Sequence, residues 1–193
     1  MNKKENNSIK INSSYFEREN IKLIKENFIK NRVIKLDDFL DKKSYGILSG
    51  NLKNLTFIAV KKPDKYSFAL ATTSSGLMKE LDLLFCRYLS SIMEKEVKFN
   101  LQIKRFSHTN YIIIHDEEFK SKKTVYEFVF YLAGKWDFDM GGNKVLRGKK
   151  NYVITPLGNS LVLTKLENGT NSFSQYINYK AGKNSFMVIE GTN

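Results

Sequence analysis

Apolar side chains recur at helical spacing in the first half of the chain and at strand spacing in the second half. In the stretch 75–95 the apolar positions lie three or four residues apart: Leu77, Leu81, Leu84, Phe85, Tyr88, Leu89 and Ile92. That spacing places them on one face of a helix. Broader apolar stripes predict two further helices, near residues 14–30 and near residues 41–50.

After residue 97 the apolar positions alternate with polar ones, which is the period of a half-buried strand. Eight short segments show this pattern: LQIKRFS, NYIIIHD, TVYEFVFYL, NKVLRG, NYVITP, SLVLTKL, FSQYINY and SFMVIE. Two earlier segments, LTFIAVKK and YSFALATT, are separated by Pro63-Asp64 and predict a hairpin. Many short strands after a helical half predict two facing antiparallel sheets, closed into a jelly roll or barrel, with the helices packed outside.

Length and composition favour one domain over the whole chain 1–193. The 193 residues are 41% hydrophobic, which supports a single well-packed core. Within this domain we expect a helical extension over 1–30, a helix-rich support over 31–96 and a β core over 97–191. The fold class predicted is α+β, mainly β.

The chain carries a net charge of +12, from 32 basic and 20 acidic residues. Such a charge attracts acidic partners, but the basic residues follow no known nucleic-acid-binding motif, so we do not expect nucleic acid to be the primary ligand. No apolar stretch is long enough for a membrane helix or a secretory signal, and we therefore expect a cytoplasmic protein. Cys86 is the only cysteine, which excludes an intramolecular disulfide and a thiolate metal cluster.

A histidine and a carboxylate follow the strand-forming segment NYIII. In extended conformation His115 and Glu117 point to one side, while Asp116 points to the other. Imidazole and carboxylate on one face make up two of the three ligands of the 2-His-1-carboxylate site that holds non-haem iron. The pattern on its own is also typical of a hydrogen-bonded pair at a strand end.

The residues around this pair form a longer series of motifs. They follow one another as His115-Asp116-Glu117-Glu118, Lys122-Lys123, Phe128-Val129-Phe130-Tyr131-Leu132, Trp136-Asp137 and Gly141-Gly142. In order and spacing the series resembles the 2-oxoglutarate/Fe(II) dioxygenases, most closely their branch of prolyl hydroxylases that acts on a ribosomal protein. The segments VIKLDDFLD (33–41) and ITPLGNSLVLTKL (154–166) resemble the same branch, so that the likeness covers most of residues 31–191.

This resemblance implies a fold, two cofactors and a set of site residues. The fold is a double-stranded β-helix, which is a jelly-roll or cupin-like core. The cofactors are Fe(II) and 2-oxoglutarate, and the reaction is hydroxylation of a peptide or a small molecule. By the same resemblance His115 and Glu117 bind the metal, while Tyr131 and Lys183 bind the carboxylate of 2-oxoglutarate. Tyr131 is equally typical of a core aromatic residue.

The distal metal position departs from the pattern of the family. Where the family has a histidine, the segment Ser172 to Tyr176 carries Ser174, or Gln175 in an alternative alignment. Neither a hydroxyl nor a neutral amide binds ferrous iron as imidazole does. His108 lies seven residues before His115, and this odd spacing places the two side chains on opposite faces of a strand. His108 could therefore supply the missing imidazole only if a bulge or turn intervened.

Two functions from different classes follow from this departure. The first is a 2-oxoglutarate-dependent oxygenase, a hydroxylase, with an altered or impaired metal site. The second is a non-catalytic binding or scaffold protein that keeps the dioxygenase fold. The persistence of His115, Glu117, Tyr131 and Lys183 together favours the first.

Overall fold

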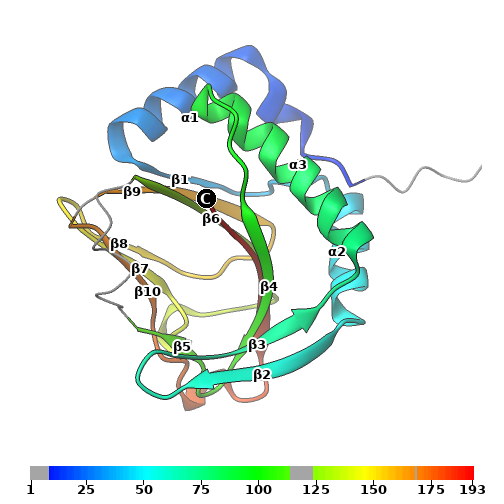
Figure 1. The fold of residues 1–193 in the computed structure, drawn as a ribbon, viewed down its shortest axis with the longest axis vertical. Coiled ribbons are helices and arrows are strands. Elements are labelled where there is room, and N and C mark those ends of the chain that lie inside the picture. Colours follow the sequence, from blue (N-terminus) through cyan, green and yellow to red (C-terminus); the bar gives the residue numbers. More distant parts are fainter. Residues whose placement is uncertain (1–8, 114–123, 168) are drawn as a thin grey trace, which may run out of the picture.

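The computed structural model describes residues 9–113, 124–167 and 169–193 (Figure 1). Its helices are α1 (Arg18–Asn31), α2 (Lys42–Lys53) and α3 (Ser75–Met93), and its short 3₁₀ helices are η1 (Ser13–Phe16), η2 (Phe138–Met140) and η3 (Tyr179–Ala181). The three helices predicted near 14–30, 41–50 and 75–95 are confirmed. None of these described helices has both the length and the apolar character needed to span a membrane.

Polar side chains mark the helix starts. The carboxylate of Asp41 accepts a hydrogen bond from the Ser44 backbone N–H, and the hydroxyl of Ser74 accepts one from the Leu77 backbone N–H. Each satisfies a backbone donor that the first turn of a helix leaves free. At the other end of α1 the chain turns at Arg32, whose left-handed φ of 62° ends the helix directly before the first strand.

The strands form one curled antiparallel sheet. The strands are β1 (Val33–Leu36), β2 (Thr56–Lys62), β3 (Tyr66–Thr72), β4 (Asn100–Ser107), β5 (Tyr111–Ile112), β6 (Val125–Leu132), β7 (Lys144–Arg147), β8 (Tyr152–Ile154), β9 (Ser160–Leu166), β10 (Asn171–Ser174) and β11 (Ser185–Thr192). Their order is β1-β9-β6-β11-β4-β3-β5-β10-β7-β8, and β2 pairs with β3. Strands β4 to β11 correspond to the eight predicted segments, and Figure 1 shows the sheet folding over so that β10, β7 and β8 face β9 and β6. The predicted jelly-roll class is confirmed.

Alternating side chains of β6 separate two apolar cores. Phe128 and Phe130 belong to the core between the sheet and the helices, where Phe128 stacks on Phe85 of α3. Val129 and Tyr131 belong to the second core, inside the curled sheet. A residue of β6 that lies an even number of positions from Val129 therefore has the same inward parity and points into the barrel.

One predicted strand is shorter than its pattern indicated. The segment 173–179 alternates like a strand, but β10 ends at Ser174. Beyond that residue the backbone N–H of Gln175 donates to Asn143 and that of Ile177 donates to Asn110, so the chain crosses between two loops instead of extending the ladder. A Cβ at Gly141 would collide with the carbonyl of Tyr176, which explains why glycine occupies this crossing.

We expect Asn159→Ala to lower the free energy of unfolding by about 3 kcal/mol, measured by urea denaturation. The Asn159 side chain makes two buried 2.9 Å hydrogen bonds with the backbone of Leu40, each worth about 1 kcal/mol. Asn159 also has a left-handed φ of 61°, which costs alanine about 1 kcal/mol more. Asn159→Gly removes the hydrogen bonds without the backbone strain and should lose less. Equal stability of both variants and the unmodified protein would contradict this account.

Candidate functional site

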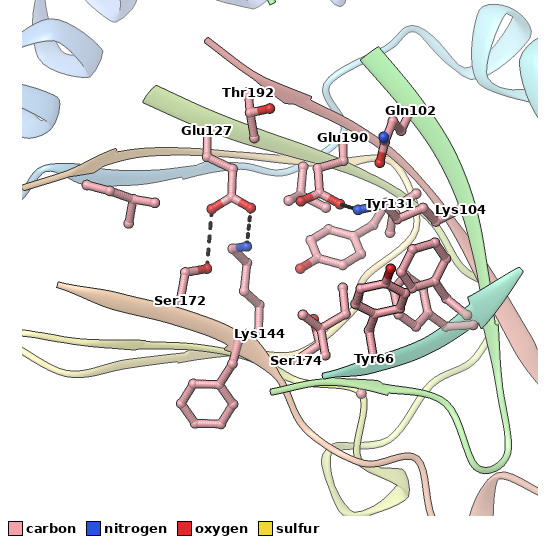
Figure 2. A pocket seen from close by; sticks show the side chains of 18 of the residues that line it. Tyr66, Gln102, Lys104, Glu127, Tyr131, Lys144, Ser172, Ser174, Glu190 and Thr192 are labelled. Carbon is pink, nitrogen blue, oxygen red and sulfur yellow. Dashed lines mark hydrogen bonds and ion pairs between the residues drawn. The ribbon is translucent and has the colours of Figure 1, made fainter. Parts of the chain in front are cut away.

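A cavity of about 550 Å³ lies inside the curled sheet (Figure 2). Apolar side chains of the second core, including Phe106, Val129 and Val188, form part of its wall. The polar residues that line it are Tyr66, Asn100, Gln102, Lys104, Glu127, Tyr131, Lys144, Glu167, Ser172, Ser174, Glu190, Thr192 and Asn193. The interior of the barrel is therefore a charged chamber as well as an apolar core. We call it the interior cavity.

The first ion pair of the interior cavity joins opposite walls. Glu127 has the inward parity of Val129 on β6, and Lys144 comes from β7. The Lys144 Nζ lies 2.6 Å from the Glu127 Oε1, and each side chain is 7% exposed. The other Glu127 oxygen accepts a 3.3 Å hydrogen bond from the Ser172 hydroxyl. Burial of both charges is tolerable only because they are paired.

A second ion pair lies beside the first. The Lys104 Nζ of β4 is 2.6 Å from the Glu190 Oε2 of β11, with the two side chains 10% and 16% exposed. The ammonium of Lys104 also lies 4.9 Å from the centre of the Phe68 ring, a cation–π contact. The two lysines and two glutamates of these pairs balance in charge. Glu167, a third carboxylate in the lining, pairs with Arg32 and Lys165, which lie outside the lining.

The two carboxyl groups differ in their affinity for a proton. Burial raises the pKa of Glu127, the neighbouring Glu190 raises it further, and Lys144 only partly opposes this. Burial also acts to raise the pKa of Glu190, but Lys104 and Lys144 outweigh it and lower that pKa to about 2. Glu127 is consequently the carboxyl group of this cavity that takes up a proton more readily.

Tyr131 presents a neutral hydroxyl to the same space. Its ring is 2% exposed and belongs to the second core. Burial, together with the charges of Glu127 and Glu190, raises the pKa of Tyr131. The hydroxyl therefore stays protonated and is able to donate a hydrogen bond to an anion. Figure 2 shows Tyr131 between the two ion pairs and Ser174.

The structure brings some of the predicted site residues together and separates others. Tyr131 and Ser174 both line the interior cavity. Lys183, by contrast, lies exposed in the turn between η3 and β11 and does not line the cavity. The role that the resemblance implies for Lys183, binding the 2-oxoglutarate carboxylate together with Tyr131, stays a prediction, and the structure places Lys183 on the exposed turn that includes Gly182, which has a positive φ of 56°.

The other predicted positions lie elsewhere. The Gln175 amide accepts a 2.8 Å hydrogen bond from the Asn143 side chain. His108 lies exposed in the turn between β4 and β5 and does not line the interior cavity. His115 and Glu117 fall outside the described residues. Ile112, three residues before His115, pairs in register with Ser174.

The charged residues of the interior cavity were missed at the level of sequence. A usable signal existed for Glu127, because it occupies a position of inward parity in β6, which is otherwise apolar on that side. On β4, by contrast, Asn100 and Gln102 share the cavity-facing side with Lys104. The pairing of each lysine with its glutamate depends on strand order, however, and Lys144 and Glu127 meet across the inside of the curled sheet. Their pairing has no short-range signature.

Comparisons with known proteins agree with this architecture. No protein-family model and no curated protein sequence matches the chain. Among solved structures, an oxidoreductase of the 2OG-Fe(II) oxygenase family from Burkholderia pseudomallei is 12% identical with a TM-score of 0.68, covering 90% of each chain. A Pseudomonas putida prolyl-4-hydroxylase is 10% identical with a TM-score of 0.70, covering 89% of this chain and 97% of its own.

A third similar structure was solved with a peptide. It is a prolyl hydroxylase from Trichoplax adhaerens, in complex with a peptide fragment of the hypoxia inducible factor oxygen degradation domain. It is 12% identical with a TM-score of 0.67, covering 94% of this chain and 93% of its own. At these identities the likeness concerns the fold. The chain has the double-stranded β-helix fold of 2-oxoglutarate/Fe(II) oxygenases and prolyl hydroxylases.

Proposed function

We propose that the protein is a hydroxylase-type 2-oxoglutarate/Fe(II) dioxygenase-like protein with an altered metal site, which binds 2-oxoglutarate in the interior cavity. The observation that carries this proposal is the position of Tyr131, Lys144 and Ser174 around one cavity inside a fold shared with 2-oxoglutarate oxygenases. About 550 Å³ is within the range of small-molecule sites, and ligands of this size are typically held by a few convergent polar groups.

Recognition of the cosubstrate carboxylate is assigned to Lys144 and Tyr131. An ammonium group supplies the charge, and the neutral hydroxyl of Tyr131 supplies a hydrogen bond. Lys144 is already paired with Glu127 at 2.6 Å, so an incoming carboxylate competes with a carboxylate of the protein itself. Lys183, which the resemblance assigned to this role, is exposed and serves as the comparison.

Metal binding is assigned to His115 and Glu117, with Ser174 in the distal place. The described residues contain no group of three or more histidine, cysteine, aspartate or glutamate side chains able to hold a metal ion. Ser174 and Gln175 do not provide an imidazole, so the distal position does not fit a 2-His-1-carboxylate site. We therefore propose weak Fe(II) binding and slow or absent turnover of 2-oxoglutarate.

The proposed substrate is a peptide or a small molecule. Support comes from the Trichoplax prolyl hydroxylase, whose structure contains a peptide fragment. If the metal site holds iron, the cofactor supplies the oxidation chemistry, and the residues described here bind and orient the cosubstrate.

The test is an anaerobic titration of the full chain with Fe(II) and 2-oxoglutarate, monitored by the charge-transfer absorption of the bound chelate and by calorimetry. We expect calorimetric binding of 2-oxoglutarate with a weak absorption band. Lys144→Met should weaken this binding by at least about tenfold, the effect of about 1.4 kcal/mol. Lys183→Ala should change it less than about twofold, since an exposed charge outside the cavity contributes little.

Three outcomes of this titration would overturn parts of the proposal. Absence of 2-oxoglutarate binding would refute the assignment of the interior cavity. A larger loss of 2-oxoglutarate affinity in Lys183→Ala than in Lys144→Met would indicate that Lys183, the residue implied by the resemblance, binds the carboxylate. Rapid iron-dependent turnover by the unmodified protein would refute the altered metal site. Lys144→Met must first be shown to be folded by circular dichroism, because it leaves Glu127 buried without a counter-charge.

A further inference from the structure

A second hollow, of about 690 Å³, opens where α1 ends, between the β7–β8 turn and the β9–β10 turn. Its charged lining residues are Lys30, Arg32, Lys149, Lys150, Lys165 and Glu167. We call it the basic groove. Five cations against one carboxylate make a local positive field, in contrast to the interior cavity, where each lysine is paired with a glutamate.

The single carboxylate of the basic groove is already engaged. Glu167 pairs with Arg32 and, at 2.9 Å, with Lys165. The hydrogen bond from Lys165 leads the causes that lower the pKa of Glu167, and the charges of Arg32 and Lys149 act in the same direction. Within the described ranges Lys30, Lys149 and Lys150 form no ion pair with a carboxylate, and the Lys150 ammonium donates a 3.5 Å hydrogen bond to the Asn31 side-chain oxygen.

A buried hydroxyl provides a second, independent observation. Thr164 of β9 lines the basic groove and is 1% exposed, yet its hydroxyl has no hydrogen-bond partner among the described residues. Buried polar atoms are nearly always hydrogen-bonded in folded proteins, because leaving one unpaired is unfavourable. Thr164 therefore contributes an unpaired hydroxyl group to the lining of the basic groove, together with lysines that have no carboxylate partner among the described residues.

We propose that the basic groove binds the phosphate group of a nucleotide, either free or within an RNA strand. A phosphate carries more negative charge than a carboxylate and has several acceptor oxygens, which matches three lysines without a carboxylate partner in an ion pair and one unpaired hydroxyl group. The hollow is also large enough for more than a phosphate alone. This site differs from the interior cavity, and its test does not depend on binding of 2-oxoglutarate or iron.

The test uses the full chain and two probes. Binding of adenosine monophosphate is measured by calorimetry, and binding of a fluorescently labelled single-stranded RNA 12-mer is measured by anisotropy at several salt concentrations. We expect at least one probe to bind, and Lys149→Ala with Lys150→Ala to weaken it by about tenfold and to reduce its salt dependence. Thr164→Val should weaken the same probe without changing the salt dependence, because it removes a hydrogen bond and no charge.

Lys61→Ala with Lys62→Ala is the matched control. These two lysines are exposed at the end of β2 and outside the basic groove, so this variant removes the same charge elsewhere. The control should change affinity less than about twofold. Binding of adenosine monophosphate would show that the phosphate of a free nucleotide is recognised. Binding of the RNA 12-mer alone would show that the phosphate is recognised within an RNA strand. Failure of both probes to bind, or equal losses in the groove variant and the control, would overturn the proposal.

Discussion

Replacing Ser174 with histidine should raise the Fe(II) affinity of the protein by at least about tenfold, and should increase uncoupled production of succinate from 2-oxoglutarate. Removal of even an outer partner of a metal ligand typically costs about 10- to 100-fold in affinity, so adding a missing direct ligand is expected to gain at least as much. Ser174 is the appropriate position because it lines the interior cavity and pairs in register with Ile112, three residues before His115. Metal affinity is measured by anaerobic titration and succinate by its formation under air.

Ser172→His is the control for this gain. Ser172 lines the same cavity from the same strand, two residues earlier, so that it faces the same side at a different depth. Its hydroxyl contacts Glu127, not the region beside Ile112. Gain in Ser174→His alone supports a site built from His115, Glu117 and the distal strand. No gain of Fe(II) affinity in Ser174→His, or an equal gain in both variants, would indicate that the cavity binds its ligand without a metal ion.

The fold was largely predictable because both of its layers have a strong hydrophobic period. The stripe through Leu81, Phe85 and Leu89 determines one face of α3, and these three side chains are fully buried against the sheet. The segment TVYEFVFYL likewise predicts a strand, and in the structure both faces of β6 pack into apolar cores. The error over 173–179 arose because the same alternation continues past Ser174, where hydrogen bonds to the loops at Asn143 and Asn110 replace the strand ladder.

The site was less predictable because it depends on contacts across the barrel. Tyr131 and Ser174, which the sequence likeness selected, both line the interior cavity and lie within strands, where the direction of a side chain follows from its parity. Lys183 lies in a turn, where parity does not determine direction, and it is exposed. Lys144 and Glu127 are 17 positions apart in sequence, and only the facing of β7 and β6 brings their charges together.

Binding of 2-oxoglutarate to the interior cavity should be accompanied by uptake of a proton by Glu127. The ligand brings negative charge to Lys144, whose present partner is the Glu127 carboxylate. Two carboxylates about 4 Å apart repel by about 4 kcal/mol at an effective dielectric constant of about 20. Protonating a carboxyl group of ordinary pKa 4.5 at pH 7 costs about 3.4 kcal/mol, and less here because the pKa of Glu127 is already raised by burial and by Glu190. Repulsion exceeds this cost, so protonation is favoured.

The direction of the pH dependence follows from that proton. At pH values between the pKa of Glu127 in the free protein and its higher pKa in the complex, the complex holds one proton more than the free protein. In that window the binding constant should rise as pH falls, by up to about tenfold per unit. The groups that face Glu127 are Lys144 on β7, Ser172 on β10 and Glu190 on β11; the pKa of Glu190 is lowered to about 2, so Glu190 stays ionised throughout.

Calorimetry in phosphate and in Tris, whose ionisation enthalpies differ, measures the number of protons taken up. We expect close to one proton for the unmodified protein at pH 7. Glu127→Gln should show none and should bind 2-oxoglutarate more tightly at neutral pH, because its Lys144 has no competing carboxylate. Glu190→Gln retains Glu127 and should keep the uptake. Binding without proton uptake, or uptake that persists in Glu127→Gln, would mean that the ligand leaves the Lys144–Glu127 pair intact and is held by other groups of the interior cavity.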